Sequence, residues 1–277
     1  MARYLDPKYD LPFKKVFGEH KYLLISFLNA LLPLPEGREI VAIEYLPPEQ
    51  APRTPLSKNS IVDVKCVDSQ HRHFLVEMQM EWNRLFASRM LFNASKAYIQ
   101  QFDKDKPEDF AKTFSTAQPV YMLAIVNANL PRQTPEEVER WYHHYTIADN
   151  KNPERVIEGM EFVTVELPKF KPETWNQTDK RMAVLWLRFL KEIDFYDAAP
   201  VELLETEEIR QAIDICEVGA YTKAELAIYD ENKVQSIWDA TYTALETTVA
   251  EQGKALAEKD AALARALAEL AVLKGTK

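Results

Sequence analysis

The chain has 277 residues, 47% hydrophobic and 28% charged, and carries a formal net charge of −9. This composition is typical of a folded globular protein, and the excess of acid argues against a protein that coats DNA non-specifically. No apolar run reaches the roughly 18 residues that cross a membrane, and the N-terminus lacks the apolar stretch of a signal peptide. Cys66 and Cys216 show neither metal-ligand nor disulfide spacing. We therefore expect a cytoplasmic protein without membrane association.

The acid is unevenly distributed along the chain. Residues 1–110 carry 15 Lys and Arg against 15 Asp and Glu, so the whole excess of acid lies in the remainder. A basic rim that contacts phosphate is therefore compatible with the N-terminal half and is not expected in the C-terminal half.

The first predicted element is a helix from Tyr9 to Leu32, because apolar residues recur there at helical spacing. Pro33 and Pro35 end it. Residues 39–46, EIVAIEYL, are predicted to form a strand, and the proline-rich segment PPEQAPRTPLSKN that follows is predicted to be a loop.

Residues 60–79, SIVDVKCVDSQHRHFLVEMQ, carry the candidate site. Two runs rich in strand-forming residues flank a polar turn, which predicts a β-hairpin. A turn centred near Ser69 and Gln70 would pair Asp63 close to Val76 and Glu77. Because side chains alternate across a strand, Glu77 and Gln79 share one face.

This arrangement suits a divalent metal ion. Mg²⁺ prefers oxygen ligands, takes one or two carboxylates, and keeps water and phosphate in its other positions. A divalent cation activates water as a nucleophile and stabilises charge on phosphate oxygens. The pattern therefore predicts Asp63 and Glu77 as ligands of Mg²⁺ or Mn²⁺, with Gln79 orienting water or a phosphate oxygen. An ordinary hairpin with polar residues on its solvent face would show the same pattern.

A helix is predicted from Trp82 to Phe102. Arg89, Asn93, Lys96 and Gln100 recur at steps of four and three and so lie on one helix face. Either Arg89 and Lys96 bind DNA phosphate beside the metal, or this face is simply solvated. The residues predicted to pack on the sheet are Leu85, Met90, Ala94, Ala97 and Tyr98.

The start of the first helix offers two further candidates. Asp10 is interpreted mainly as an N-cap, a position that aspartate fills well. The alternative is that Asp10 adds an acidic group to the metal site. Lys14 either contacts DNA or faces solvent.

After a nearly all-apolar strand from Pro119 to Asn127, predicted to be buried on both faces, a further strand is predicted at residues 161–167. The order α-β-β-β-α-β results. Beyond residue 171 the chain is predicted to be helical, at 179–193, 209–218 and 223–229. We expect three regions, a core at 1–170, a helical region at 171–235 and a C-terminal helix at 236–277.

The C-terminal helix carries a short heptad signal. Leu256, Leu263 and Leu270 recur every seven residues. This spacing is typical of a short coiled coil and is compatible with a homodimer. A single helix that docks on the body, or frays, is the alternative.

Several motifs in order resemble the recombination-promoting nuclease / putative transposase family of the PD-(D/E)XK nuclease superfamily. They are YDLPFKKVFG at 9–18, FLNALLP at 27–33, IVDVKC with Asp63, VEMQ with Glu77 and Gln79, Arg89, SKAYIQQ at 95–101, PVYMLAIV at 119–126 and VELPKF at 165–170. The likeness covers roughly residues 3–200.

The resemblance implies an α/β fold with a restriction-endonuclease-like core and a mixed sheet. It also implies a metal-dependent DNA endonuclease linked to recombination or transposition, with Asp63, Glu77 and Gln79 as the catalytic residues. Gln101 matches a family position and is expected near the DNA.

Two departures from the superfamily pattern leave other functions open. Its usual third catalytic residue is lysine, where this chain has Gln79, and FDKDKPEDF after Gln101 lacks an expected glycine and tyrosine. The alternatives are a catalytically silent DNA-binding relative and a protein-interaction module that uses the acidic C-terminal half.

Overall fold

The computed structural model describes residues 3–46, 62–80, 82, 84–102, 117–130, 134–171 and 181–275. The chain divides into two compact units, Met1–Val234 and Gln235–Lys277. The proline-rich segment predicted as a loop, and most of the segment FDKDKPEDF, lie outside the described residues. No described helix is long and apolar enough to cross a membrane.

Within the described residues of the first unit, one mixed sheet has the strand order β1-β2-β3-β4-β6-β5. The strands β1, β2 and β3 are antiparallel neighbours, whereas β3, β4 and β6 run parallel, and β5 is antiparallel to β6. The carboxyl ends of three parallel strands therefore meet at one edge. The bounds are β1 Ile43–Tyr45, β2 Val62–Asp68, β3 His73–Gln79, β4 Val120–Val126, β5 Tyr142–Ala148 and β6 Val156–Glu166.

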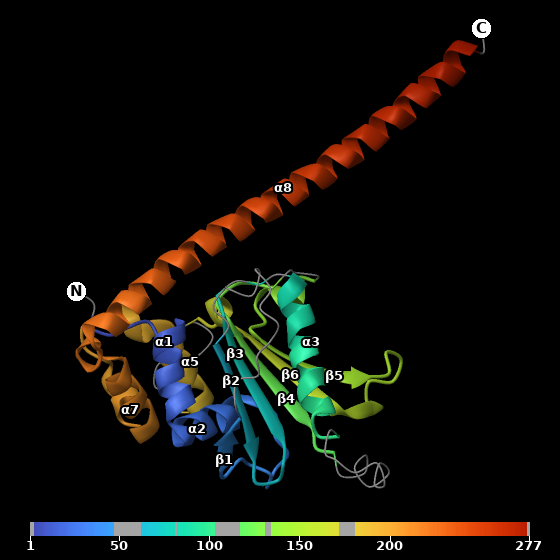
Figure 1. Cartoon of the computed structure of the whole chain (residues 1–277). Helices are drawn as coiled ribbons and strands as arrows, with labels where there is room; N and C mark the ends of the chain where they lie inside the picture. Colours follow the sequence, from blue (N-terminus) through green and yellow to red (C-terminus); the bar gives the residue numbers. More distant parts are fainter. Residues whose placement is uncertain are drawn as a thin grey trace. The chain divides into compact units, whose positions relative to one another are not determined.

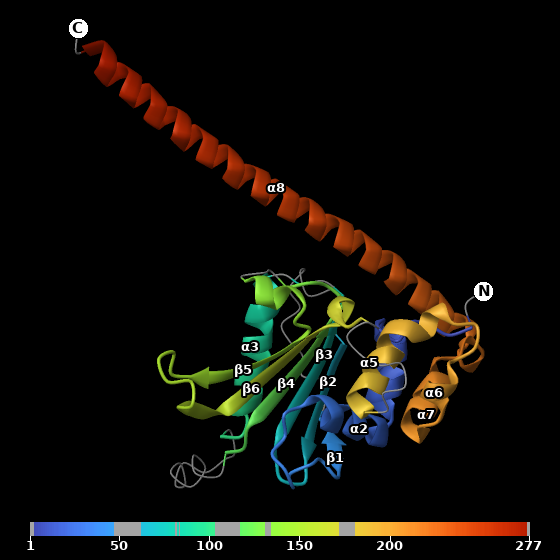
Figure 2. The same cartoon turned by 180° about the vertical axis from the view of Figure 1, so that it is seen from behind.

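Helices cover both faces of this sheet (Figures 1 and 2). The helices of the chain are α1 Asp10–Phe13, α2 Lys21–Leu31, α3 Arg84–Ile99, α5 Met182–Glu192, α6 Val201–Leu204, α7 Glu207–Cys216 and α8 Lys223–Gly275, of which α2, α5 and α7 pack on one face of the sheet and α3 on the other. Shorter turns are the π-helical η1 Lys14–Gly18 and the 3₁₀ segments η4 Pro135–Val138, η5 Leu167–Lys169, η7 Ile193–Phe195 and η8 Val218–Ala220.

The two faces of the sheet bury different sets of side chains, as strand alternation requires. On one face, Val64, Val76 and Leu123 belong to the larger core, together with residues of α2, α5 and α7. On the other face, Leu75 and Met122 pack against residues of α3. All positions of β4 are buried, which confirms the prediction of a strand covered on both sides.

The predicted helix from Tyr9 to Leu32 is wrong in one respect, because the structure divides it. After α1 the chain makes the π turn η1, and His20 is extended before α2 begins. The His20 ring nitrogen Nδ1 lies 2.7 Å from the carbonyl oxygen of Lys15. A side chain therefore contacts the carbonyl at the point where the helix breaks.

The strand predicted at residues 39–46 is shorter, because only Ile43–Tyr45 pairs with β2. The backbone of Ile40 instead bonds to the side chain of Asn29, whose Oδ1 accepts from Ile40 N at 2.8 Å and whose Nδ2 donates to Ile40 O at 2.9 Å. An asparagine from α2 thus takes the place of a strand neighbour.

Two more elements differ from the prediction. The strand predicted at 161–167 begins earlier, at Val156, because its first residues pair with β5, a strand that was not predicted. Gly159 adopts φ 133°, close to a register shift between Thr146 and Ile147. The predicted short helix at 223–229 is the first part of the 53-residue helix α8.

In the second unit, residues 235–275 continue α8. Large apolar side chains along this part are exposed, and four of them recur every seven residues. They are Tyr242, Val249, Leu256 and Leu263.

Candidate functional site

The hairpin pairs the two predicted carboxylate positions directly. Asp63 faces Glu77 across β2 and β3, and the turn falls at Ser69 and Gln70, as predicted. Residues paired in this way lie on the same face of a sheet. Glu77 belongs to the face covered by α3, because its neighbour Leu75 packs there.

Helix α3 forms hydrogen bonds with two polar residues of β3, Glu77 and Gln79. Asn93 Nδ2 donates to Glu77 Oε1 at 2.7 Å, and Arg89 Nη2 donates to Gln79 Oε1 at 2.9 Å. Four residues of helix rise about 6 Å, and two residues of strand rise about 6.6 Å. The two spacings match, so a helix that runs antiparallel to β3 can place Arg89 beside Gln79 and Asn93 beside Glu77. We call these two hydrogen bonds the α3–β3 ladder.

The hydrogen bond between Asn93 and Glu77 is almost completely shielded from solvent. Glu77 is 1% exposed and Asn93 9% exposed. A buried carboxylate is costly unless polar partners compensate for lost water, and the amide of Asn93 supplies one such partner. The sequence analysis placed Asn93 on the correct helix face but did not predict its bond to Glu77. The matching spacings of Glu77–Gln79 and Arg89–Asn93 were the signal for it.

Not every residue predicted to pack on the sheet does so. Met90, Ala94 and Ala97 are buried against it, but Leu85 is 63% exposed and Phe86 is buried in its place. The helix also starts at Arg84 rather than Trp82 and ends at Ile99 rather than Phe102.

Asp10 is not an N-cap. Tyr9 occupies that position, and no side chain caps α1. The Asp10 carboxylate instead forms an ion pair with Lys14, at 2.8 Å. The start of α1 lies near the carboxyl end of β3, because Met80 packs against the cluster that contains Tyr9. Asp10 and Lys14 are therefore on elements close to the Glu77 end of the sheet.

Lys96 and Gln101 are further from Glu77 along the chain than Asn93 is. Lys96 lies in the last turn of α3, and Gln101 follows the end of the helix. Lys96 is partly buried, one turn past Asn93. Both ends of the Gln101 amide bond to the backbone of Gln118, at 2.9 Å and 2.8 Å, just before β4 begins. The structure does not bring Gln101 together with Glu77, since β4 and β3 are parallel and Glu77 pairs with Ala124 near the other end.

A second buried carboxylate lies near the carboxyl ends of the parallel strands and was not predicted. Glu166 is 0% exposed, and its Oε1 lies 2.7 Å from His143 Nε2 and 2.6 Å from Lys169 Nζ. Its Oε2 accepts the backbone N–H of Leu130 at 2.7 Å. The adjacent His144 contacts Glu161 instead, so the two histidines diverge.

Glu166 occupies the same row of the sheet as Gln79, since each pairs with Val126 of β4. Two strand spacings of roughly 4.8 Å separate their backbones. The motif VELPKF contains both Glu166 and Lys169. The sequence could have indicated this cluster, because Glu166 and Lys169 are three residues apart at the end of a predicted strand.

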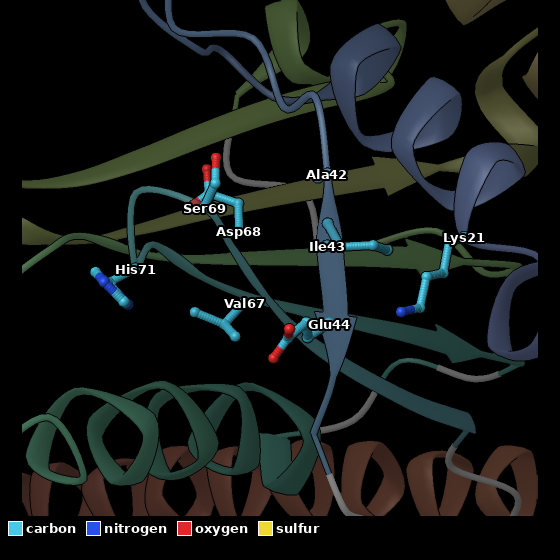
Figure 3. A pocket seen from close by; sticks show the side chains of 8 residues that line it. All are labelled: Lys21, Ala42, Ile43, Glu44, Val67, Asp68, Ser69 and His71. Atoms are coloured by element: carbon cyan, nitrogen blue, oxygen red, sulfur yellow. The ribbon is translucent and has the colours of Figure 1, made fainter.

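A surface pocket of about 320 Å³ lies elsewhere, at the hairpin turn and the edge strand β1 (Figure 3). Lys21 reaches towards β1 from α2, while Asp68, Ser69 and His71 line it from the turn. Asp68 is held by Arg72, whose Nε donates to Asp68 Oδ2 at 2.7 Å. The pocket is at the opposite end of β2 from Asp63.

Among the described side chains, no three His, Cys, Asp or Glu residues are grouped to hold a metal ion, and the side chain of Asp63 lies outside that set. The two cysteines are free and buried. Burial raises the pKa of the Cys66 thiol to about 12.

The mixed sheet and the acid pair on adjacent strands define an α/β core of the PD-(D/E)XK nuclease type. The sequence profile of the PD-(D/E)XK nuclease family transposases matches residues 7–247. The chain belongs to this family, which confirms the predicted family and fold. The match extends beyond the 3–200 expected from the motifs. No curated protein and no solved structure matches the chain.

Proposed function

We propose that this nuclease-family protein is a metal-dependent endonuclease that hydrolyses phosphodiester bonds in DNA, in the context of recombination or transposition. Membership of a nuclease and transposase family supports the general role. The observation that carries the specific proposal is the pairing of Asp63 with Glu77 beside the α3–β3 ladder.

The donor chemistry fits a divalent cation. Glu77 offers a carboxylate whose Oε1 is already held by an amide, and Asp63 is its direct partner across the hairpin. Carboxylate oxygens are the ligands that Mg²⁺ and Mn²⁺ take in such sites. We propose Mg²⁺ or Mn²⁺ as the ion, bound by Asp63 and Glu77, with Asp10 as an additional acidic group. When bound, this ion activates water and stabilises charge on the phosphate oxygens.

The protein's own groups then hold the substrate. Arg89 on α3 reaches the edge of β3 beside Glu77 and supplies a cation for a DNA phosphate. Lys96, Lys14 and Gln101 are proposed as outer DNA contacts. Asn93 holds the Glu77 carboxylate in one orientation, because its amide donates to Oε1.

Plasmid cleavage tests this proposal. We expect wild-type protein with Mg²⁺ or Mn²⁺ to nick or linearise supercoiled plasmid, and EDTA to stop it. Asp63→Asn and Glu77→Gln keep the side-chain shape but remove the charges, so both should be inactive while remaining folded by circular dichroism. Leu91→Ala, at an exposed position of α3, serves as the matched control. Wild-type cleavage by either acid variant would refute the site.

Gln79 in place of lysine favours a second candidate function, a silent DNA-binding member of the family. Such a protein would bind duplex DNA with a folded site and cleave nothing in either metal. An interaction protein would instead bind no DNA and lose its partner when residues 236–277 are deleted.

We also propose three regions and a dimer. The regions are the core at 1–170, the helical region at 171–235 and the helix at 236–277. The exposed residues that repeat every seven positions along α8 support association of two chains through this helix. A dimer would present two sites to one duplex.

A further inference from the structure

The third position of the candidate site lacks the expected cation, but a cation is bound to it. Gln79 is 9% exposed and its side-chain oxygen accepts from Arg89 Nη2 at 2.9 Å. A glutamine amide is neutral, so it cannot offset the negative charge of a phosphate. The guanidinium that it holds can, because arginine stays protonated at every relevant pH.

The surroundings of Arg89 fix where that charge lies. The guanidinium carbon is 5.2 Å from the centre of the Phe86 ring, which is itself buried. Phe86 therefore supports the guanidinium from α3, while Gln79 fixes one of its nitrogens from β3. A cation bound at Gln79 is two strand residues from Glu77, roughly 6.6 Å along the strand.

We infer that Arg89 is the catalytic cation of this site and that Gln79 is the residue that positions it. Two residues would thus replace the usual lysine of the superfamily: Arg89 on α3 would supply the positive charge, and Gln79 on β3 would hold it in place. This inference rests on the proposed function, because it assigns roles within the same phosphodiester reaction.

The reaction gives the guanidinium a defined task. The oxygen of one water bonds to phosphorus, one ester P–O bond breaks, and a proton from the water ends on the leaving oxygen. Negative charge on the phosphoryl oxygens rises in the transition state, and a fixed cation stabilises that charge. Arg89 keeps its own protons throughout.

Other cations near the site are placed less favourably. Lys65 lies on the same sheet face as Asp63, but it pairs with Leu75. It is therefore closer to the hairpin turn than the Asp63–Glu77 pair, and further from Gln79. Lys14 is ion-paired with Asp10 and is 51% exposed at its side chain. Arg89 is the cation that the structure bonds directly to the third position.

Cleavage kinetics test the inference first. Arg89→Ala should lower kcat/KM by about 100-fold or more, the typical cost of removing one group that stabilises transition-state charge. Lys65→Ala and Arg210→Ala, an exposed position on α7, are the matched cation controls and should stay within about threefold of wild type. Wild-type rates in Arg89→Ala, or loss of cleavage in Lys65→Ala alone, would overturn the inference.

The pH profile separates a charge role from a structural one. Arg89→Lys should retain part of the activity but lose it at alkaline pH, as a lysine of ordinary pKa near 10.4 deprotonates. The wild type should show no such decline. The double variant Gln79→Lys/Arg89→Gln moves the cation from helix to strand, and should be at least about tenfold more active than Arg89→Gln alone. Equal activity in these two variants would count against the assignment.

The contact between Arg89 and a DNA phosphate can also be tested by a binding measurement that needs neither metal nor cleavage. Affinity for a 20-base-pair duplex is measured in EDTA at several salt concentrations. Arg89→Ala should reduce the salt slope by about one, as expected for the loss of a single phosphate contact, while Arg210→Ala leaves it unchanged. An unchanged slope in Arg89→Ala would overturn the contact. A wild-type protein that neither binds nor cleaves DNA would overturn both the proposed function and this inference.

Discussion

The buried carboxylate of Glu77 is held in one orientation by a hydrogen bond. It is 1% exposed, yet Asn93 donates a hydrogen bond to one of its oxygens. The amide of Asn93 is neutral, and its hydrogen bond fixes the orientation of the carboxylate. Glu166, the other buried acid near this edge of the sheet, contacts Lys169 and His143.

The hydrogen bond between Asn93 and Glu77 predicts the effect of removing the amide. Asn93→Ala should lower the metal affinity and kcat/KM by about 10- to 100-fold, because residues that hold a metal ligand typically contribute this much. Calorimetry with Mn²⁺ and plasmid cleavage measure the two quantities. Leu91→Ala, exposed on the same helix, should change neither. Full metal affinity in Asn93→Ala would show that the amide does not orient Glu77.

At the scale of elements, an ion pair joins η1 to the start of α8. Lys15 Nζ lies 2.7 Å from Glu225 Oε1 and 4.2 Å from the centre of the Tyr221 ring. Glu225 also accepts the backbone N–H of Thr222 at 2.7 Å, as in a capping box. The hydrogen bond from Lys15, together with those from Thr222, lowers the pKa of Glu225 to about 2.

The lowered pKa gives a pH-dependent stability with a definite sign. A carboxyl group whose pKa is lower in the folded state stabilises it above the unfolded pKa and loses this effect as pH falls. Glu225→Gln should therefore lower Tm at pH 7, and the difference from wild type should shrink between pH 4.5 and about 2. Glu231→Gln, on an exposed position of the same helix, is the control. A Tm difference that is constant across this range would contradict the assignment.

The elements also show what the sequence could and could not predict. The Asp63–Glu77 pairing was predictable, because the turn residues Ser69 and Gln70 determine the register of a hairpin. The interruption at His20 was not, since the apolar periodicity continues through it. Strand β5 was missed because YHHYTIA is largely exposed and polar, so its pairing with β6 depends on tertiary context.

The contacts of the α3–β3 ladder were only weakly indicated by the sequence, through the matching spacings of the two residue pairs. Periodicity places Arg89 and Asn93 on one helix face, but it cannot say which strand that face meets. Glu166 required the folded sheet as well, because His143 comes from a strand that the sequence did not reveal.

For the whole molecule, α8 carries a row of exposed apolar side chains among the residues that the structure describes. Tyr242, Val249, Leu256 and Leu263 are each about 60% exposed and recur at one heptad position. Gln252 and Lys259 lie three residues after Val249 and Leu256, where a stable coiled coil would have apolar side chains. Any association should therefore be weak and depend on concentration.

We expect Leu256→Ser/Leu263→Ser to abolish that association. Sedimentation equilibrium should report a mass that rises with concentration towards twice 32.0 kDa for the wild type and stays at 32.0 kDa for the variant. The ratio of linear to nicked plasmid should fall in parallel, because two sites no longer act on one duplex. Ala261→Ser, on the opposite side of the helix, is the control. A monomeric wild type at all concentrations would rule out the dimer.

The α3–β3 ladder has a consequence for when this protein becomes active. A displacement of α3 by a single residue would break both hydrogen bonds together, because Arg89 and Asn93 lie on one helix and would move away from Gln79 and Glu77 at the same time. A newly made chain whose helix has not yet docked would therefore lack both the oriented Glu77 and the fixed guanidinium of Arg89. Under the proposed function, DNA cleavage would therefore begin only after α3 has packed on the sheet, and a partly folded chain would be inactive.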